Sequence, residues 1–424
     1  MERLGYINVV NPRAVAKRIG FVGWQSQVCC ETLPSVSAAE ELKSQTTRRT
    51  DGAVATAALY VAFFGTGVGL VLPGALLPLL LVRWALSDEQ AGALFFVLFV
   101  GSMAGALLAR WTLPLSVMRG SLAVALGAVA LGSASRMLAF PAMALYGLGL
   151  GMVMTGVSVL ESRRRTTDRT AHITRLNFVW AAGACVAPVF ALRGAAVWGA
   201  AWVLWLLAGW FVVAGMVVAV VVKHVEAPSV SGGTWWLQLL RTPKALLIMV
   251  PLATGVESAV NGWLSTYSKR EGNSLGVTVG AATCFWVGLL LSRLVQSNRG
   301  VAARSARSLL AVLPWVMVAG LVVLVAMRSG EGVLAGALLL GLGVGPMYPA
   351  LLARVLERGE AGNAVFVVAG VGSSVLPLVT GVVSGWTGSL RMGLGVPLAG
   401  VMVMAVCGWM AGRGASFGSG LERA

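Results

Sequence analysis

The chain has 424 residues, of which 57% are hydrophobic and only 11% carry a charge. Soluble domains carry about 25% charged residues, so this composition excludes a disordered chain and an ordinary soluble enzyme. The net charge of +16 would indicate nucleic-acid binding only if it gathered on a soluble face. The class that fits this composition is a protein that crosses a membrane many times. We expect no nucleic acid among its partners.

The first segment, residues 1–52, mixes charged residues such as Arg13, Lys17 and Glu41 with short apolar pieces. None of these pieces reaches the length of a signal-peptide core. The segment therefore predicts a disordered cytosolic tail that precedes the membrane part of the chain.

Cysteine and histidine are too few and too scattered to build a metal site. The five cysteines include no Cys-x-x-Cys spacing, and the only two histidines, His172 and His224, flank different apolar runs. We therefore expect free thiols, no metal and no cofactor.

Apolar stretches of membrane-spanning length follow one another from Ala53 onward. A helix rises about 1.5 Å per residue, so about 20 apolar residues cross a hydrocarbon core of about 30 Å. The alternating pattern of β-barrel strands is absent, so we expect an all-α polytopic membrane protein. The expected spans are 55–82, 90–109, 117–135, 138–160, 173–192, 195–222, 244–267, 275–296, 308–327, 332–353, 362–386 and 392–412.

The basic residues divide unevenly between the two sides of these spans. With the N-terminus inside, 25 of the 32 Lys and Arg residues fall in inside segments and 7 in outside connections. Because cytoplasmic loops are enriched in Lys and Arg, we expect both termini in the cytoplasm. The positive surplus then faces the anionic lipids of the cytoplasmic leaflet of the inner or plasma membrane.

The two halves of the chain repeat each other at an offset of about 190 residues. The matches are Thr66-Gly67-Val68-Gly69 with Thr254-Gly255-Val256-Glu257, Gly147–Gly151 with Gly341–Gly345, and Gly183–Pro188 with Gly372–Pro377. Six spans separate the copies, so both have the same orientation, which is the layout of major facilitator transporters. We expect six-helix halves at 53–222 and 244–413, a cytoplasmic loop at 223–243 and a cytosolic tail at 414–424.

Over about residues 55–412 the chain resembles the major facilitator superfamily, and within it the branch of fucose–proton symporters and related sugar permeases. The resemblance rests on Gly147–Gly151, Leu176-Asn177-Phe178, Gly183, Pro188, Gly255-Val256-Glu257, Trp263, Tyr267, Phe285-Trp286, Gly288, Arg293, Gly341–Gly345, Pro346 and Pro349. The loop after the second span departs from the superfamily pattern, since Gly105–Arg110 lacks its usual acid. The first span also lacks the acid of the fucose permeases. The resemblance implies alternating access around a central site.

Glu257 is the acid that lies well inside an apolar span. Holding a carboxylate at membrane depth costs on the order of 2.5–3.5 kcal/mol, which makes an idle position facing lipid unfavourable. We therefore expect Glu257 to bind substrate or a proton; the alternative is a carboxyl bonded to a neighbouring helix for packing alone. Asn261 lies one helical turn later on the same face, so we expect it either beside Glu257 in the site or in an interhelical hydrogen bond.

Asn177 and Trp180 share a helix face in the fifth span. An amide can bond a sugar hydroxyl and an indole can stack on a pyranose ring, so we expect both to bind substrate. Trp286 and Tyr348 are further aromatic candidates. The alternative for each aromatic residue is packing or a place at the membrane interface.

The remaining candidates concern gating. Gly147, Gly151, Gly341 and Gly345 form two Gly-x-x-x-Gly steps, which let helices approach closely, either for sliding or for static packing. Glu161, at the cytoplasmic end of the fourth span, could pair with a loop arginine such as Arg165 to form a gate. Arg293 could pair with an acid in the same way, and the alternative for these arginines is retention on the cytoplasmic side.

Together these observations predict a monomeric secondary transporter, not an enzyme, for a small polar solute. A sugar is the expected substrate, and Glu257 is the expected proton-linked or substrate-anchoring group. An exporter of drugs or lipophilic cations is the alternative within the superfamily. A membrane receptor or assembly protein without solute flux is the alternative from another class.

Overall fold

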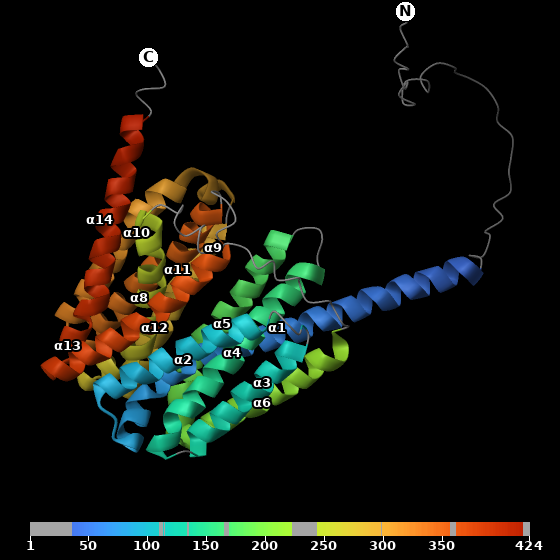
Figure 1. Ribbon diagram of the computed structural model, residues 1–424, viewed down its shortest axis with the longest axis horizontal. Helices are drawn as coiled ribbons and strands as arrows, with labels where there is room; N and C mark the ends of the chain where they lie inside the picture. Colours follow the sequence, from blue (N-terminus) through green and yellow to red (C-terminus); the bar gives the residue numbers. More distant parts are fainter. Residues whose placement is uncertain are drawn as a thin grey trace, which may run out of the picture. The chain divides into compact units, whose positions relative to one another are not determined.

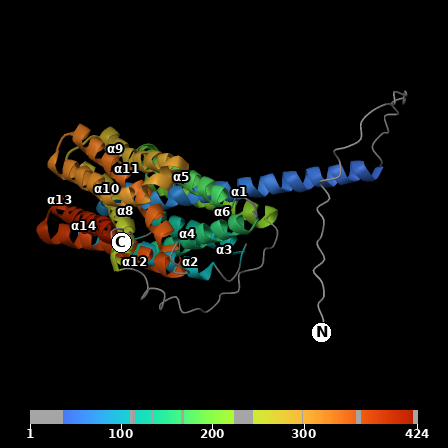
Figure 2. The same cartoon turned by 90° about the horizontal axis from the view of Figure 1, so that it is seen from above.

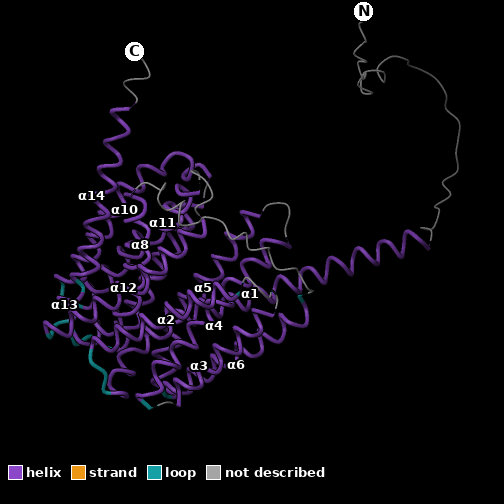
Figure 3. Tube along the Cα trace, in the orientation of Figure 1, coloured by secondary structure: helices purple, strands orange, loops and turns teal. Residues whose placement is uncertain are grey.

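The computed structural model describes residues 36–109, 113, 115–133, 135–164, 169–222, 244–297, 299–356 and 362–418. The chain divides into two compact units, residues 1–50 and 51–424, and the candidate membrane spans belong to the second. The expected central loop at 223–243 lies outside the described residues, as does Arg165. None of the described residues forms a strand (Figure 3).

Twelve of the helices in the described part of the chain are long and apolar enough to cross a membrane, which confirms the expected number of spans. In the first half they are α1 (Val36–Trp84), α2 (Asp88–Leu108), α3 (Leu115–Ser133), α4 (Arg136–Arg164), α5 (Arg169–Trp198) and α6 (Ala200–Val221). In the second half they are α8 (Lys244–Arg270), α9 (Leu275–Ser297), α10 (Arg299–Ala326), α11 (Gly330–Leu356), α12 (Gly362–Thr387) and the pair α13 (Leu390–Gly393) and α14 (Gly395–Gly418).

Several boundaries differ from the sequence prediction, and two of the differences have a local cause. α1 begins at Val36, so residues 36–52 are helical where we expected disordered tail. The run Ala38–Lys43 contains strong helix formers, and extending an existing helix needs no new nucleus. The last span is broken at Leu394, because Pro397 has no N–H to donate to the carbonyl of Gly393.

The two halves have the same internal packing, as their sequence repeat predicts. In the first half α2 packs on α4, α3 on α4 and α3 on α6; in the second half α9 packs on α11, α10 on α11 and α10 on α14. The helices of each half gather on their own side of the bundle in both views (Figures 1 and 2). The halves contact each other through α2 with α12 and through α5 with α9.

The repeated glycines explain how each half packs so closely. A Cβ on Gly147 or Gly151 of α4 would lie 2.1 or 1.9 Å from a backbone oxygen of α2. In the second half, a Cβ on Gly341 or Gly345 of α11 would lie 2.0 or 2.5 Å from a backbone oxygen of α9. All four contacts lie within one half, so the geometry favours the packing interpretation of these glycines over sliding between halves.

Candidate functional site

Glu257 of α8 lies opposite Arg293 of α9. Its Oε2 is 4.0 Å from Arg293 Nη2, and the two side chains are 18% and 20% exposed. The Nε–H of Arg293 donates to the carbonyl of Gly345 on α11 at 3.0 Å, which fixes the guanidinium beside Glu257. Arg293, which sequence reasoning assigned to a gate, therefore lies beside the acid that it singled out.

Two other predicted residues, Tyr348 and Asn261, lie on α11 and α8. Tyr348 follows Gly345, whose carbonyl accepts from Arg293, by three residues on α11. Asn261 instead reaches α1, where its Nδ2 donates to the carbonyl of Leu70 at 3.5 Å. Glu257 and Asn261 thus contact different helices, and Asn261 forms the interhelical hydrogen bond that was its alternative interpretation.

Trp180 and Trp286 bring the two halves together. Trp180 of α5 and Trp286 of α9 meet edge to face with ring centroids 5.6 Å apart, a favourable aromatic geometry. Both are nearly fully buried. The Nε1 of Trp180 has no hydrogen-bond partner among the described residues. Asn177, three residues earlier on α5, is exposed and lies apart from this contact.

Glu161 lies at the far end of α4, where the sequence predicted a gate. It is fully buried, and its Oε1 lies 3.4 Å from Nδ1 of His172 on α5. Both residues belong to the first half, so this contact joins two neighbouring helices of one half rather than the two halves.

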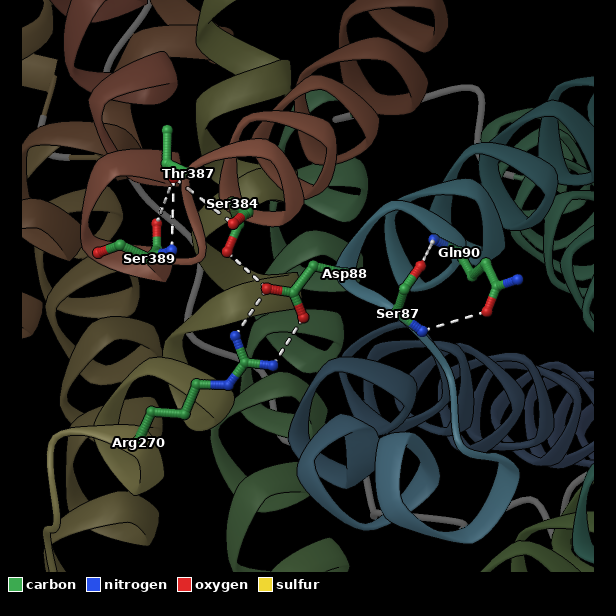
Figure 4. A network of polar contacts seen from close by, with 7 residues as sticks. All are labelled: Ser87, Asp88, Gln90, Arg270, Ser384, Thr387 and Ser389. Atoms are coloured by element: carbon green, nitrogen blue, oxygen red, sulfur yellow. Dashed lines mark hydrogen bonds and ion pairs between the residues drawn. The ribbon is translucent and has the colours of Figure 1, made fainter.

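Sequence reasoning missed a polar contact of three hydrogen bonds between the halves (Figure 4). Asp88, at the start of α2, accepts two hydrogen bonds from the guanidinium of Arg270, at 2.6 and 2.7 Å. It accepts a third at 2.5 Å from the hydroxyl of Ser384 on α12. One carboxylate of the first half thereby binds two helices of the second half, at the end of the bundle where α2 begins, which we call the Asp88 end.

A local sequence signal places Asp88 at this position. The hydroxyl of Ser87 accepts from the backbone N–H of Gln90, and the side chain of Gln90 accepts from the backbone N–H of Ser87. This reciprocal capping box starts α2 at Asp88, and an acid is favoured in the first turn of a helix. The pattern Ser87-x-x-Gln90 marks the start of the helix, but it does not reveal the partner of Asp88.

Close backbone contacts between the halves continue from the ion pair toward the middle of the bundle. A Cβ on Gly74 of α1 would lie 2.3 Å from the backbone oxygen of Asn261 on α8. A Cβ on Gly92 of α2 would lie 2.9 Å from the backbone oxygen of Leu378, and one on Gly381 of α12 would lie 2.4 Å from that of Asp88. The halves therefore touch backbone to backbone here, and glycine makes that approach possible.

No protein-family model matches the sequence, and no curated protein matches it. The fold is similar to solved structures of a bacterial homolog to the human lysosomal transporter Spinster. The inward-facing and occupied form matches with a TM-score of 0.61 and 12% identity over 84% of this chain and 96% of that chain. The inward-facing and unoccupied form matches with a TM-score of 0.62 and 12% identity over 86% of this chain and 97% of that chain.

This likeness agrees with the twelve spans and the duplicated halves: the chain has the all-helical major facilitator fold. At 12% identity it shows the fold alone. The narrower resemblance to fucose–proton symporters and sugar permeases stays a prediction.

Proposed function

We propose that the chain is a secondary transporter that carries a small polar solute across the inner or plasma membrane by alternating access. The observation that carries the proposal is the Asp88–Arg270 contact, which joins two duplicated halves at one end of the bundle. The fold, similar to that of a transporter homolog solved in an inward-facing form, supports it. From the sequence resemblance we propose more specifically that the solute is a sugar and that its transport is coupled to protons through Glu257.

The Asp88 end serves as a gate in this proposal. Because Asp88 binds Arg270 and Ser384 across the halves, these hydrogen bonds must break before that end can open. The uneven distribution of basic residues supports placing this end away from the cytoplasm. With these bonds formed, the bundle is then closed to the outside.

Glu257 and Arg293 form the candidate centre for binding. Their helices, α8 and α9, both belong to the second half, and α9 contacts α5 of the first half through Trp286. Movement of one half relative to the other would change the surroundings of this pair. The alternative of a lipophilic-cation exporter is less favoured, because Arg293 places a positive charge beside the acid that would attract a cation.

Glu257→Gln is expected to reduce solute uptake into proteoliposomes by about tenfold, or about 1.4 kcal/mol, because the carboxylate is lost while the shape is kept. If the coupling ion is a proton, uptake by the parent chain rises with an imposed proton gradient, and the variant loses that response. Initial uptake rates with and without the gradient measure both effects.

Glu331→Gln is the matched control, since Glu331 is an exposed acid in the first turn of α11 and lies outside the candidate centre. It should transport like the parent chain. Unchanged uptake and gradient response in Glu257→Gln would exclude the assigned role. A parent chain that binds solute without flux would favour the receptor alternative.

A further inference from the structure

Glu257 and Arg293 face each other as an ion pair but lie too far apart for a hydrogen bond. Hydrogen bonds between ionised groups measure about 2.7–2.9 Å, whereas Glu257 Oε2 and Arg293 Nη2 lie 4.0 Å apart. Another ion pair of the second half does form a hydrogen bond, because Arg391 donates to Glu271 at 2.6 Å. Glu257 Oε2 and Arg293 Nη2 therefore do not satisfy each other, and each can form a hydrogen bond with a molecule that enters between them.

Arg293 is held to the backbone through its Nε–H, which donates to the carbonyl of Gly345, and its Nη2 lies toward Glu257. A guanidinium held in this way binds a carboxylate with its planar fork. Glu257 can accept from an ammonium group only a few ångströms away.

Two aromatic residues lie between the halves on the helix that carries Arg293 and on α5. Trp286 lies two helical turns before Arg293 on α9, and Trp180 packs against it from the other half. The Nε1–H of Trp180 is a buried donor without a partner in the described part of the chain. Because buried donors normally find an acceptor, this indole is available to an acceptor oxygen of a molecule that enters between the halves.

We propose, on the basis of the transport function above, that this site binds a small zwitterion whose carboxylate and ammonium groups sit on the same or neighbouring carbon atoms. The carboxylate pairs with Arg293 and the ammonium with Glu257, so the four charges alternate around a compact square. A ligand with only a positive charge is repelled by Arg293, and a ligand with only a negative charge is repelled by Glu257. A sugar would satisfy hydrogen bonds but would bring no opposite charge to either member of the pair.

A binding experiment on purified full-length protein in detergent tests this directly. The probes are the twenty proteinogenic amino acids and trimethylglycine, with 6-aminohexanoate, amino-acid methyl esters, N-acetyl amino acids, fucose, glucose and tetraphenylphosphonium as comparators. Ligands of the folded state raise the melting temperature, and calorimetry then gives the dissociation constants. We expect at least one α-zwitterion to bind at least tenfold more tightly than its ester, its N-acetyl form and the longer 6-aminohexanoate.

The variants separate the two charges. Glu257→Gln and Arg293→Gln should each weaken zwitterion binding at least tenfold, and Arg293→Lys should weaken it less, because it keeps the charge but loses the fork. Arg391→Gln, which breaks the hydrogen-bonded ion pair with Glu271, should leave binding unchanged. The ligand series on the parent chain stands by itself if a variant fails to fold.

The proposal is overturned if no amino acid or betaine binds, if the ester or N-acetyl form binds as well as the zwitterion, or if a sugar or tetraphenylphosphonium binds instead. Its failure is distinguishable from that of the transport function by flux. Zwitterion binding without uptake into proteoliposomes would contradict transport alone, and uptake of a sugar would contradict the zwitterion alone.

Discussion

Replacing Arg270 by Met is expected to shift the bundle about tenfold toward arrangements in which the Asp88 end is open. The variant keeps the apolar stem of Arg270 but removes both hydrogen bonds to Asp88. Asp88 is 12% exposed and Arg270 43%, so the pair lies between a surface pair worth about 0–1 kcal/mol and a buried pair whose disruption costs about 3–5 kcal/mol. A value of about 1.4 kcal/mol corresponds to the tenfold shift.

Spin labels at Ser135 and Arg328, one in each half and both exposed, report the opening. In a background without the five native cysteines, the distance distribution between the labels should gain a longer component in Arg270→Met. Arg391→Met is the matched control, because it breaks an ion pair of the same 2.6 Å length within the second half. Identical distributions for Arg270→Met and the parent chain would contradict a gate at the Asp88 end.

Gly74→Val is expected to prevent closure of the Asp88 end while leaving each half folded. The new Cβ would lie 2.3 Å from the backbone oxygen of Asn261, which cannot move aside by changing a rotamer. The halves must therefore separate at this contact. We expect the shorter component of the label distances to disappear and solute uptake to fall at least tenfold, with a melting temperature close to that of the parent chain.

Gly147→Val is the control for this substitution, because it makes an equally close contact inside one half. Its Cβ would lie 2.1 Å from the backbone oxygen of Leu98, so the first half must repack internally. Overpacking of this kind typically costs about 1–3 kcal/mol, and the melting temperature should fall. Equal thermal destabilisation by the two variants would show that the Gly74 contact serves the stability of the whole bundle rather than opening and closing.

Much of the fold could be predicted from the sequence, because a bilayer is a simple solvent. Each span needs enough apolar residues to cross the hydrocarbon core and must satisfy its backbone internally, so length and composition reveal it. The repeated glycines revealed the duplication, since close helix packing requires small residues at corresponding places in both halves. Glu257 stood out because a carboxylate at membrane depth is costly.

The partners of the charged residues could not be predicted in this way. Asp88 lies 182 residues from Arg270 and 296 from Ser384, and its own sequence context shows only the start of a helix. Arg293 seemed to end a span, yet it lies beside Glu257. Such pairings depend on how each helix is rotated and how deeply it sits against its neighbours.

The sequence by itself thus determined the number of spans, their duplication and the acid that lies well inside a span. Only the tertiary structure decided which helix ends meet at Asp88 and which cation lies beside Glu257. The physical reason is that hydrophobicity acts on each helix separately, whereas an ion pair exists only after two helices have packed in one particular register.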